Sequence, residues 1–302
     1  MNSFFANGKL LITGEYLVLN GALSLAVPTK KGQSLLFQED QGSHLNWESL
    51  DSDNNCWFSC KFFSKDLTII KTSDQKTANF LQKLLINALS FKNSSINISG
   101  KVQTKLDFPR NWGLGSSSTL ISCIAKWFNI NPFQLHFSVS QGSGYDIACA
   151  QATSAITYIL ENGKPKHEQI SWNPKFKNQL FFVHLNKKQD SQNEVKTFLK
   201  KNKRHTKSVL EITSLTKEII ECDELCTFKE IISKHEQLMS NLLGTPTIKE
   251  KYFSDFNGVI KSLGAWGGDF ILVCGDKKEK NYFINKGFTT HLNFENELIN
   301  IN

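Results

Sequence analysis

One segment, residues 110–119, constrains the fold of this chain more than any other. It reads Arg-Asn-Trp-Gly-Leu-Gly-Ser-Ser-Ser-Thr, and a stretch with apolar residues at helical spacing, 116–128, starts at its first serine. Glycines allow a sharp bend and a close approach of the backbone to a ligand. The first N–H groups of a helix have no partner within it, so together with the helix dipole they attract anions. The segment therefore predicts an anion-binding loop that leads into a helix, with a plain glycine turn and serine N-cap as the alternative.

The three serines of this segment add hydroxyl groups that can bind phosphate or Mg²⁺. The chain contains no G-x-x-x-x-G-K-[ST] sequence, which excludes a P-loop of the Walker type. If the segment binds phosphate, it does so in a different structural context.

Three other segments combine glycines with a charged side chain. Asp146 follows a glycine turn and precedes a run of small residues, so it could act near a helix start as a general base or as a simple cap. The glycine cluster at 264–269 either approaches a ligand or forms a tight loop before the apolar strand 270–274. Lys9, expected at the start of a strand, could reach a phosphate or activate a substrate hydroxyl, or else be a surface lysine.

The rest of the chain mixes strands and helices without strict alternation, which indicates an α+β fold in two lobes. The length of 302 residues fits about two domains. We expect the boundary in the polar, lysine-rich stretch 162–178, which gives lobes of residues 1–172 and 173–302. Helical spacing of apolar residues occurs at 77–90, 116–128, 228–242 and 248–260. Strands are expected at 10–13, 23–27, 57–63, 96–104, 154–160, 179–185 and 270–274.

The net charge of +7 suits an anionic small molecule as well as nucleic acid. The basic cluster at 196–207 is typical of a solvated helix face, and no aromatic residue interleaves with its later part, so we expect no nucleic-acid partner. No apolar run reaches the ~20 residues of a membrane span, and the N-terminus lacks a signal-peptide pattern. The seven cysteines are expected to be reduced core residues rather than metal ligands. These features predict a cytoplasmic protein that does not bind membranes.

Three motifs occur in the order found in a known family: Gly8-Lys9 with Gly14-Glu15-Tyr16, then residues 113–118, then residues 264–268. On these motifs the sequence resembles the GHMP kinases, a family that includes galactokinase, homoserine kinase, mevalonate kinase and phosphomevalonate kinase. The resemblance spans residue 7 to about residue 275. It implies an N-terminal lobe like the second domain of ribosomal protein S5 and a ferredoxin-like C-terminal lobe, with ATP and Mg²⁺ as cofactors.

The resemblance also implies roles for individual residues. Asp146 matches the catalytic aspartate that faces the substrate hydroxyl, and Lys9 matches the lysine that helps to activate this hydroxyl. Ser117 stands in the place of a Mg²⁺ ligand. The ATP phosphates would be held by Gly113, Leu114, Gly115, Ser116, Ser117 and Ser118. Substrate contacts are expected from Glu15, Tyr16, Arg110, Gly144, Gly264, Gly267 and Gly268.

Several positions distinguish the members of the family. Tyr16, Trp112 and Asp269 are closer to phosphomevalonate kinases, which favours phosphomevalonate over mevalonate as the small-molecule substrate. The stretch 129–141 has no acidic residue that could be a second Mg²⁺ ligand, and Trp266 stands where a small residue is usual. A catalytically silent nucleotide or metabolite sensor and a diphosphomevalonate decarboxylase remain alternatives, and the protein is expected to be a monomer or homodimer.

Two further residues have competing interpretations. Arg110, one of only two arginines, either contacts a substrate carboxylate or phosphate in a bidentate manner or pairs with carboxylates of the protein. His235 falls on the apolar face of its helix, which favours a core histidine with satisfied hydrogen bonds over a ligand.

Overall fold

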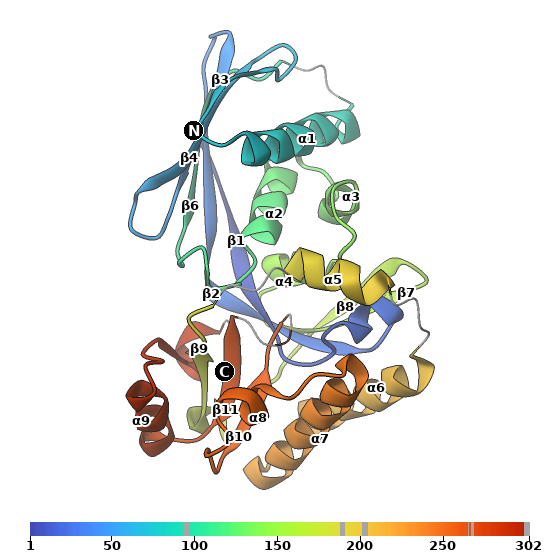
Figure 1. Ribbon diagram of the computed structural model, residues 1–302. Helices are drawn as coiled ribbons and strands as arrows, with labels where there is room; N and C mark the ends of the chain where they lie inside the picture. Colours follow the sequence, from blue (N-terminus) through green and yellow to red (C-terminus); the bar gives the residue numbers. More distant parts are fainter. Residues whose placement is uncertain (94–96, 188–190, 201–204, 265, 267–268, 299–302) are drawn as a thin grey trace. The chain divides into compact units, whose positions relative to one another are not determined.

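The computed structural model describes residues 1–93, 97–187, 191–200, 205–264, 266 and 269–298. Helices and strands are mixed within these ranges, which confirms the predicted α+β class (Figure 1). The chain forms two compact units, the first made of residues 1–8, 31–110 and 114–151 and the second of 9–30, 111–113 and 152–302. Strands β1 (Asn2–Leu11) and β2 (Ser24–Glu39) contribute to both units. The single boundary after residue 172 stays a prediction.

The first unit is a sheet with helices α1, α2 and α3 along one side (Figure 1). Its strands pair in the order β5-β4-β3-β6-β2, and β3 and β6 run parallel. The strands are β3 (His44–Leu50), β4 (Cys56–Phe63), β5 (Ile69–Thr72) and β6 (Gly100–Leu106). The helices are α1 (Gln75–Phe91), α2 (Ser116–Phe128), α3 (Pro132–Phe137) and α4 (Tyr145–Gln151). Apolar side chains from the strands and from α1 and α2, such as Trp47, Leu84 and Ile124, form one buried core.

The second unit contains a four-stranded antiparallel sheet in the order β10-β11-β9-β12. Its strands are β9 (Leu180–His184), β10 (Val259–Ser262), β11 (Phe270–Cys274) and β12 (His291–Asn293). The hairpin of β7 (Ala155–Glu161) and β8 (Lys164–Ile170) pairs through β7 with the start of β2.

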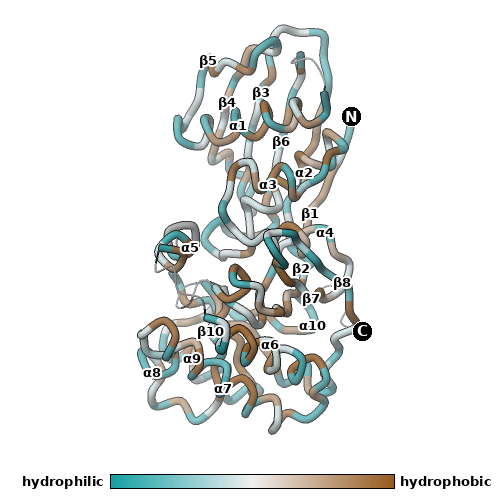
Figure 2. Tube along the Cα trace, turned by 90° about the vertical axis from the view of Figure 1, so that its right-hand side faces the viewer, coloured by the Kyte–Doolittle hydropathy of each residue, from teal (hydrophilic) through white to brown (hydrophobic). Residues whose placement is uncertain are grey.

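The helices of the second unit are amphipathic, so apolar residues (brown) and polar residues (teal) recur along them in Figure 2. They are α5 (Ser191–Lys200), α6 (Thr206–Glu221), α7 (Leu225–Leu243), α8 (Ile248–Tyr252), α9 (Lys277–Asn285) and α10 (Phe294–Glu297), and the short 3-10 helices are η1 (Leu17–Asn20) and η2 (Lys177–Gln179). Apolar residues of β9, β10 and β11 pack against α8 and α9 to form the core on one side of the sheet.

Most of the expected elements are confirmed, and two keep the predicted bounds: the helix at 116–128 is α2 and the strand at 270–274 is β11. The helical spacing at 248–260 is misleading. Helix α8 ends at Tyr252, and Val259 begins β10, which pairs with β11. The Asn257-Gly258 pair between them is a poor helix former, and the β-branched residues Val259 and Ile260 are better placed in a strand.

One other expectation needs correction, and one strand lies where the sequence predicts none. The sequence predicts Lys9 at the start of a strand, but β1 begins at Asn2, so Lys9 lies close to its end. The polar stretch 162–178 contains strand β8, which is held by its antiparallel pairing with β7 despite its polar composition. Pairing between strands cannot be recognised from either segment alone, because it depends on the partner strand.

Candidate active site

The start of α2 in the first unit has the geometry of an anion site. Gly115 is its N-cap in a left-handed conformation (φ 91°) and provides no side-chain cap. The Thr119 N–H donates to the Gly115 carbonyl at 2.9 Å, so the N–H groups of Ser116, Ser117 and Ser118 precede the helical ladder. These N–H groups and the positive end of the helix dipole favour a bound anion.

The three serines of this turn differ in their surroundings. Ser118 is buried, and its hydroxyl donates a hydrogen bond to the Gly115 carbonyl at 2.8 Å, which stabilises the turn. Ser117 is exposed and makes no side-chain hydrogen bond to a residue that the structure describes. Ser117 therefore has a hydroxyl that is available for a ligand, and its role as a Mg²⁺ ligand stays a prediction.

The preceding residues, 111–113, belong to the second unit and are fixed there by several contacts. The Trp112 ring packs edge-on against Phe270, with 5.5 Å between ring centroids, and the Asn111 carbonyl lies 3.2 Å from Nε2 of His184. The Lys9 ammonium donates a hydrogen bond to the Gly113 carbonyl at 2.8 Å. Lys9 thus lies directly at the beginning of the predicted phosphate loop.

Glycine is required at position 113 both by the backbone conformation and by the nearby side chain of Asp269. Its φ is +65°, and a Cβ atom there would lie 1.9 Å from Oδ2 of Asp269. We expect Gly113→Ala to lower the free energy of unfolding by at least about 1 kcal/mol more than Gly163→Ala, as measured by urea denaturation. Gly163 is the matched control, because its φ is +74° but no atom would lie within 4 Å of a Cβ added there. Equal losses of unfolding free energy in the two variants would show that the Asp269 side chain moves away from the added methyl group at no cost.

Asp146 lies in the first turn of α4, in the first unit. Gly144, directly before the helix, has φ 87°, a conformation that glycine adopts readily. The Asp146 carboxylate is half-buried, and its Oδ1 accepts a hydrogen bond from the Ile147 N–H at 3.1 Å. The predicted position of Asp146 at a helix start is confirmed.

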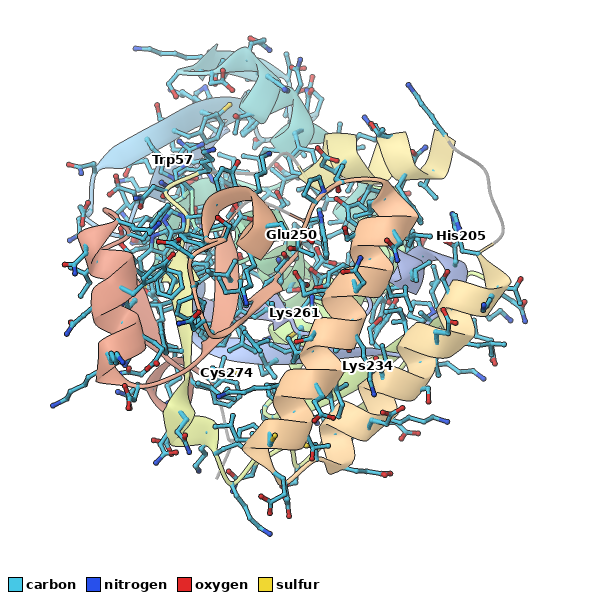
Figure 3. The ribbon with its side chains drawn as sticks, turned by 60° about the horizontal axis from the view of Figure 1, so that its bottom comes forward. Trp57, His205, Lys234, Glu250, Lys261 and Cys274 are labelled. Atoms are coloured by element: carbon cyan, nitrogen blue, oxygen red, sulfur yellow. The ribbon has the colours of Figure 1, made fainter. Side chains whose placement is uncertain are left out.

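The second unit contains a buried ion cluster that includes one predicted substrate residue. Lys261, which Figure 3 labels, lies in β10, and its side chain has no exposed surface. Its ammonium contacts the Glu15 carboxylate and lies 3.2 Å from Oε1 of Glu236. Glu236 also accepts a hydrogen bond from Ser262 at 2.8 Å. His235 precedes Glu236 on α7, and its Nε2 lies 3.4 Å from Oε2 of Glu15. Glu15 is completely buried and contacts protein side chains here, which differs from the direct substrate contact that the sequence predicts.

Burial controls the protonation of this cluster. Removal from water raises the pKa of Glu15 to about 7, although the Lys261 charge opposes the shift. Burial also raises the pKa of Glu236 and lowers the pKa of His235 well below its usual range. For Lys261, burial lowers the pKa, but the charges of Glu15 and Glu236 outweigh it and the pKa is raised. These directions favour a charged Lys261 and a neutral His235.

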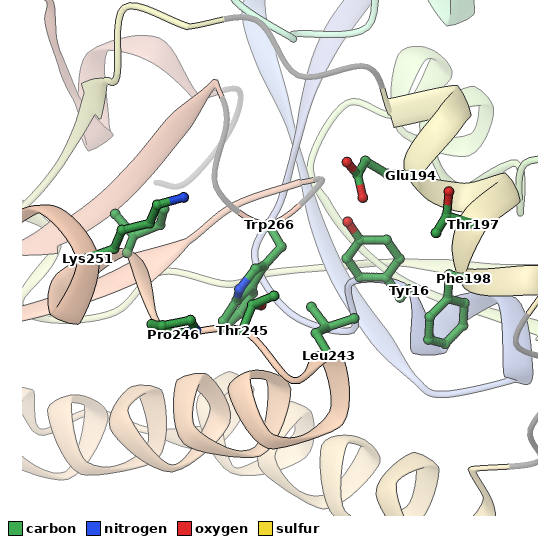
Figure 4. A pocket seen from close by; sticks show the side chains of 10 residues that line it. Tyr16, Glu194, Thr197, Phe198, Leu243, Thr245, Pro246, Lys251 and Trp266 are labelled. Atoms are coloured by element: carbon green, nitrogen blue, oxygen red, sulfur yellow. The ribbon is translucent and has the colours of Figure 1, made fainter.

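Tyr16, the residue after Glu15, lines a pocket of about 420 Å³ in the second unit (Figure 4). Lys251 lies at one end of the pocket, residues of α5 lie at the other, and Tyr16 and Trp266 lie between them. The described residues that line it are Tyr16, Glu194, Thr197, Phe198, Leu243, Thr245, Pro246, Ile248, Lys251 and Trp266. Aromatic and aliphatic side chains predominate, so the pocket suits a ligand with an apolar skeleton.

The remaining predicted residues lie in different environments. The Arg110 guanidinium stacks on the Trp57 ring at 3.6 Å. Burial lowers the pKa of Arg110, and the charges of Asp51 and Asp74 act in the opposite direction, so this arginine has acidic neighbours within the protein. Gly264 has φ 67° and open space around it. Gly267 and Gly268 lie outside the described residues.

The sequence analysis does not identify Lys261 or Glu236 as residues of a site. It assigns His235 to the core. The signal for Lys261 is a single charged residue inside the apolar run 259–263. A lysine in a buried strand needs a carboxylate partner, which the sequence does not identify. The predicted core position of His235 is confirmed: it is buried, and its Nε2 accepts a hydrogen bond from the Gly14 N–H at 3.3 Å. The prediction that its hydrogen bonds are satisfied holds only for this nitrogen, because the buried Nδ1 has no partner among the described residues.

The residues at the start of α2 fit a bound nucleotide phosphate, since their N–H groups precede the helical ladder and Ser117 is exposed. Among the described residues there is no group of three or more His, Cys, Asp or Glu that could bind a metal ion without a ligand's help. Mg²⁺ in phosphoryl-transfer sites is commonly held by one or two protein groups together with substrate phosphates. Within the described part of the chain, no helix is long and apolar enough to cross a membrane.

Comparison with known proteins identifies the fold. No family model and no curated protein sequence matches the chain. Among solved structures, phosphomevalonate kinase of Streptococcus pneumoniae, in complex with phosphomevalonate and AMPPNP, is 17% identical with a TM-score of 0.71, over 97% of this chain and 99% of that chain. Mevalonate kinase of Methanococcus jannaschii is 15% identical with a TM-score of 0.69, over 94% of each chain. Galactokinase of Lactococcus lactis, complexed with galactose, is 12% identical with a TM-score of 0.66. The match covers 98% of this chain and 92% of that chain. The chain has the GHMP kinase fold, as predicted.

Proposed function

We propose that the protein is an ATP- and Mg²⁺-dependent kinase that phosphorylates a small anionic metabolite. The observation that carries the proposal is the start of α2, where the left-handed N-cap Gly115 leaves N–H groups and the exposed Ser117 available for phosphate. This feature occurs at the motif that resembles the phosphate loop of GHMP kinases, within a chain of that fold. We further propose that the enzyme acts in the cytoplasm, as a monomer or homodimer.

The proposed roles follow from the chemistry of phosphoryl transfer, which consists mainly of positioning and charge neutralisation. Residues 113–118 would hold the ATP phosphates, and Ser117 would be a Mg²⁺ ligand. Bound Mg²⁺ would neutralise charge on the phosphates. Asp146 would orient the acceptor group or take its proton, and Lys9 would offset negative charge beside the phosphate loop.

The pocket of the second unit favours an acceptor with an aliphatic skeleton over a sugar. A sugar exposes many hydroxyl groups, each of which needs a hydrogen-bond partner when buried, whereas Phe198, Leu243 and Pro246 provide none from their side chains. We propose that this pocket takes the carbon skeleton of phosphomevalonate or, second, of mevalonate. Tyr16, from the Gly-Glu-Tyr motif, is one of its walls.

One end of the pocket provides positive charge for an anionic group. Lys251 lines it, and Lys187 lies 3.3 Å from the hydroxyl of Tyr252. Hydrogen bonds with Lys251 and Lys187 lower the pKa of Tyr252. Neither lysine makes an ion pair with a carboxylate among the described residues. A carboxylate or phosphate of the acceptor is therefore the expected partner at this end.

The function is tested by ADP release with MgATP and, in parallel, phosphomevalonate, mevalonate, homoserine, galactose or no acceptor. We expect turnover with phosphomevalonate and a lower rate with mevalonate. ATP binding without turnover on any acceptor would favour the nucleotide sensor. Failure to bind ATP would contradict the role of the α2 start.

The pocket assignment has its own test. Leu243→Trp would fill part of the pocket, so we expect the KM for the acceptor to rise at least tenfold while the KM for ATP changes less than twofold. Leu210→Trp is the control, because Leu210 on α6 is 66% exposed and does not line the pocket. An unchanged acceptor KM in Leu243→Trp would place the acceptor elsewhere.

A further inference from the structure

The buried ion cluster lies directly behind two walls of the pocket. Glu15 precedes Tyr16 in the chain, and the Lys261 ammonium lies 6.0 Å from the centre of the Trp266 ring. Tyr16 and Trp266 are only 7% and 8% exposed, and both line the pocket. The Glu15–Lys261 ion pair therefore joins the segments that carry the two aromatic walls, although these residues are 246 positions apart.

Both walls have a backbone conformation that must be held in place. Tyr16 has φ 59° and ψ −47°, and Trp266 has φ 34°. Residues with side chains avoid this region, and such strain costs about 1–3 kcal/mol per residue unless the surroundings impose it. Beside Tyr16, the surroundings are the buried contacts of Glu15 with Lys261 and the hydrogen bond from Gly14 to His235.

We propose that Lys261 is a positioning residue for the acceptor: its ion pairs with Glu15 and Glu236 hold Tyr16 and Trp266 as the walls of the pocket. The inference rests on the proposed function, in which this pocket takes the acceptor. Lys261 has no exposed surface and does not itself reach the ligand. Its loss should therefore weaken acceptor binding and leave ATP binding unchanged.

The two carboxylate partners of Lys261 belong to different elements of the second unit. Glu236 is fixed to β10 by the hydrogen bond from Ser262 and belongs to the long helix α7. Glu15 belongs to the loop after β1, and among the described residues Lys261 is the one cation within ion-pair distance of it, since the nearby His235 is neutral. Glu15 pairs with Lys261 and directly precedes Tyr16, so it fixes the position of Tyr16 relative to Lys261.

The test compares Lys261→Met and Glu15→Gln with wild type. We expect Lys261→Met to raise the acceptor KM, and the acceptor Kd by calorimetry, at least tenfold, and Glu15→Gln to raise both about three- to tenfold. The KM for ATP should change less than twofold in both. Lys234→Met is the control, because it removes the same charge from an exposed position of α7 (Figure 3). Equal acceptor affinity in wild type and both variants would overturn the proposal.

A second measurement needs neither turnover nor a ligand. In protein labelled with 5-fluorotryptophan, the ¹⁹F resonance of Trp266 is identified by its loss in Trp266→Phe. We expect this resonance to shift or broaden in Lys261→Met and in Glu15→Gln, but not in Lys234→Met. If wild type phosphorylates no acceptor, the proposed function fails and this resonance still decides whether Lys261 positions Trp266. An unchanged resonance in both cluster variants would overturn the positioning role.

Discussion

Asp146→Asn is expected to lower kcat with the preferred acceptor by a factor of about 10²–10⁴, the range found when a positioned acid or base is removed. Asparagine keeps the shape of the side chain and can still accept the hydrogen bond from the Ile147 N–H. It cannot take a proton or carry the negative charge that Asp146 would present to the acceptor. The affinity for MgATP, measured by calorimetry, should stay within about threefold of wild type, because the α2 start is unchanged.

The control for this experiment is Asp53→Asn, which removes an exposed carboxylate of the same unit from the turn between β3 and β4. Its kcat should equal that of wild type. A kcat within tenfold of wild type in Asp146→Asn would contradict the proposed role. A parallel loss of MgATP affinity would indicate that Asp146 supports the nucleotide and not the acceptor.

The parts of the site that could be predicted are those formed by residues near one another in the sequence. The bounds of α2 follow from apolar spacing after Gly115, and the position of Asp146 follows from the glycine turn before it. Both depend on local backbone geometry, which residue types largely determine. The same is true of β11, whose apolar run ends at Cys274.

The parts that could not be predicted depend on contacts between distant segments. The resemblance to GHMP kinases implies that Glu15 contacts the substrate, but the fold buries it against Lys261. Val259 and Ile260 continue a helical spacing, yet pairing with β11 makes them a strand. Local preference amounts to about 1 kcal/mol or less per residue, so burial and strand pairing override it.

The buried cluster also makes a stability prediction that does not depend on the reaction. Lys261→Met should lower the free energy of unfolding by about 3–5 kcal/mol, because it leaves Glu15 and Glu236 buried without their cation. Methionine fills much of the same space, so lost packing contributes little. Urea denaturation followed by circular dichroism measures the change, and Lys234→Met serves again as the exposed control.

The double variant separates the ion pair from the individual side chains. Lys261→Met leaves two buried carboxylates without their cation, and adding Glu15→Gln removes one of them. The double variant should therefore be more stable than Lys261→Met alone. The remaining Glu236 keeps its hydrogen bond from Ser262, and burial has already raised its pKa, so it can become neutral. We expect a coupling energy of about 0.5–3 kcal/mol from the double-mutant cycle. Losses that simply add would mean that Glu15 and Lys261 stabilise the fold independently, and the ion pair would then not be what holds the Gly14–Tyr16 turn to β10.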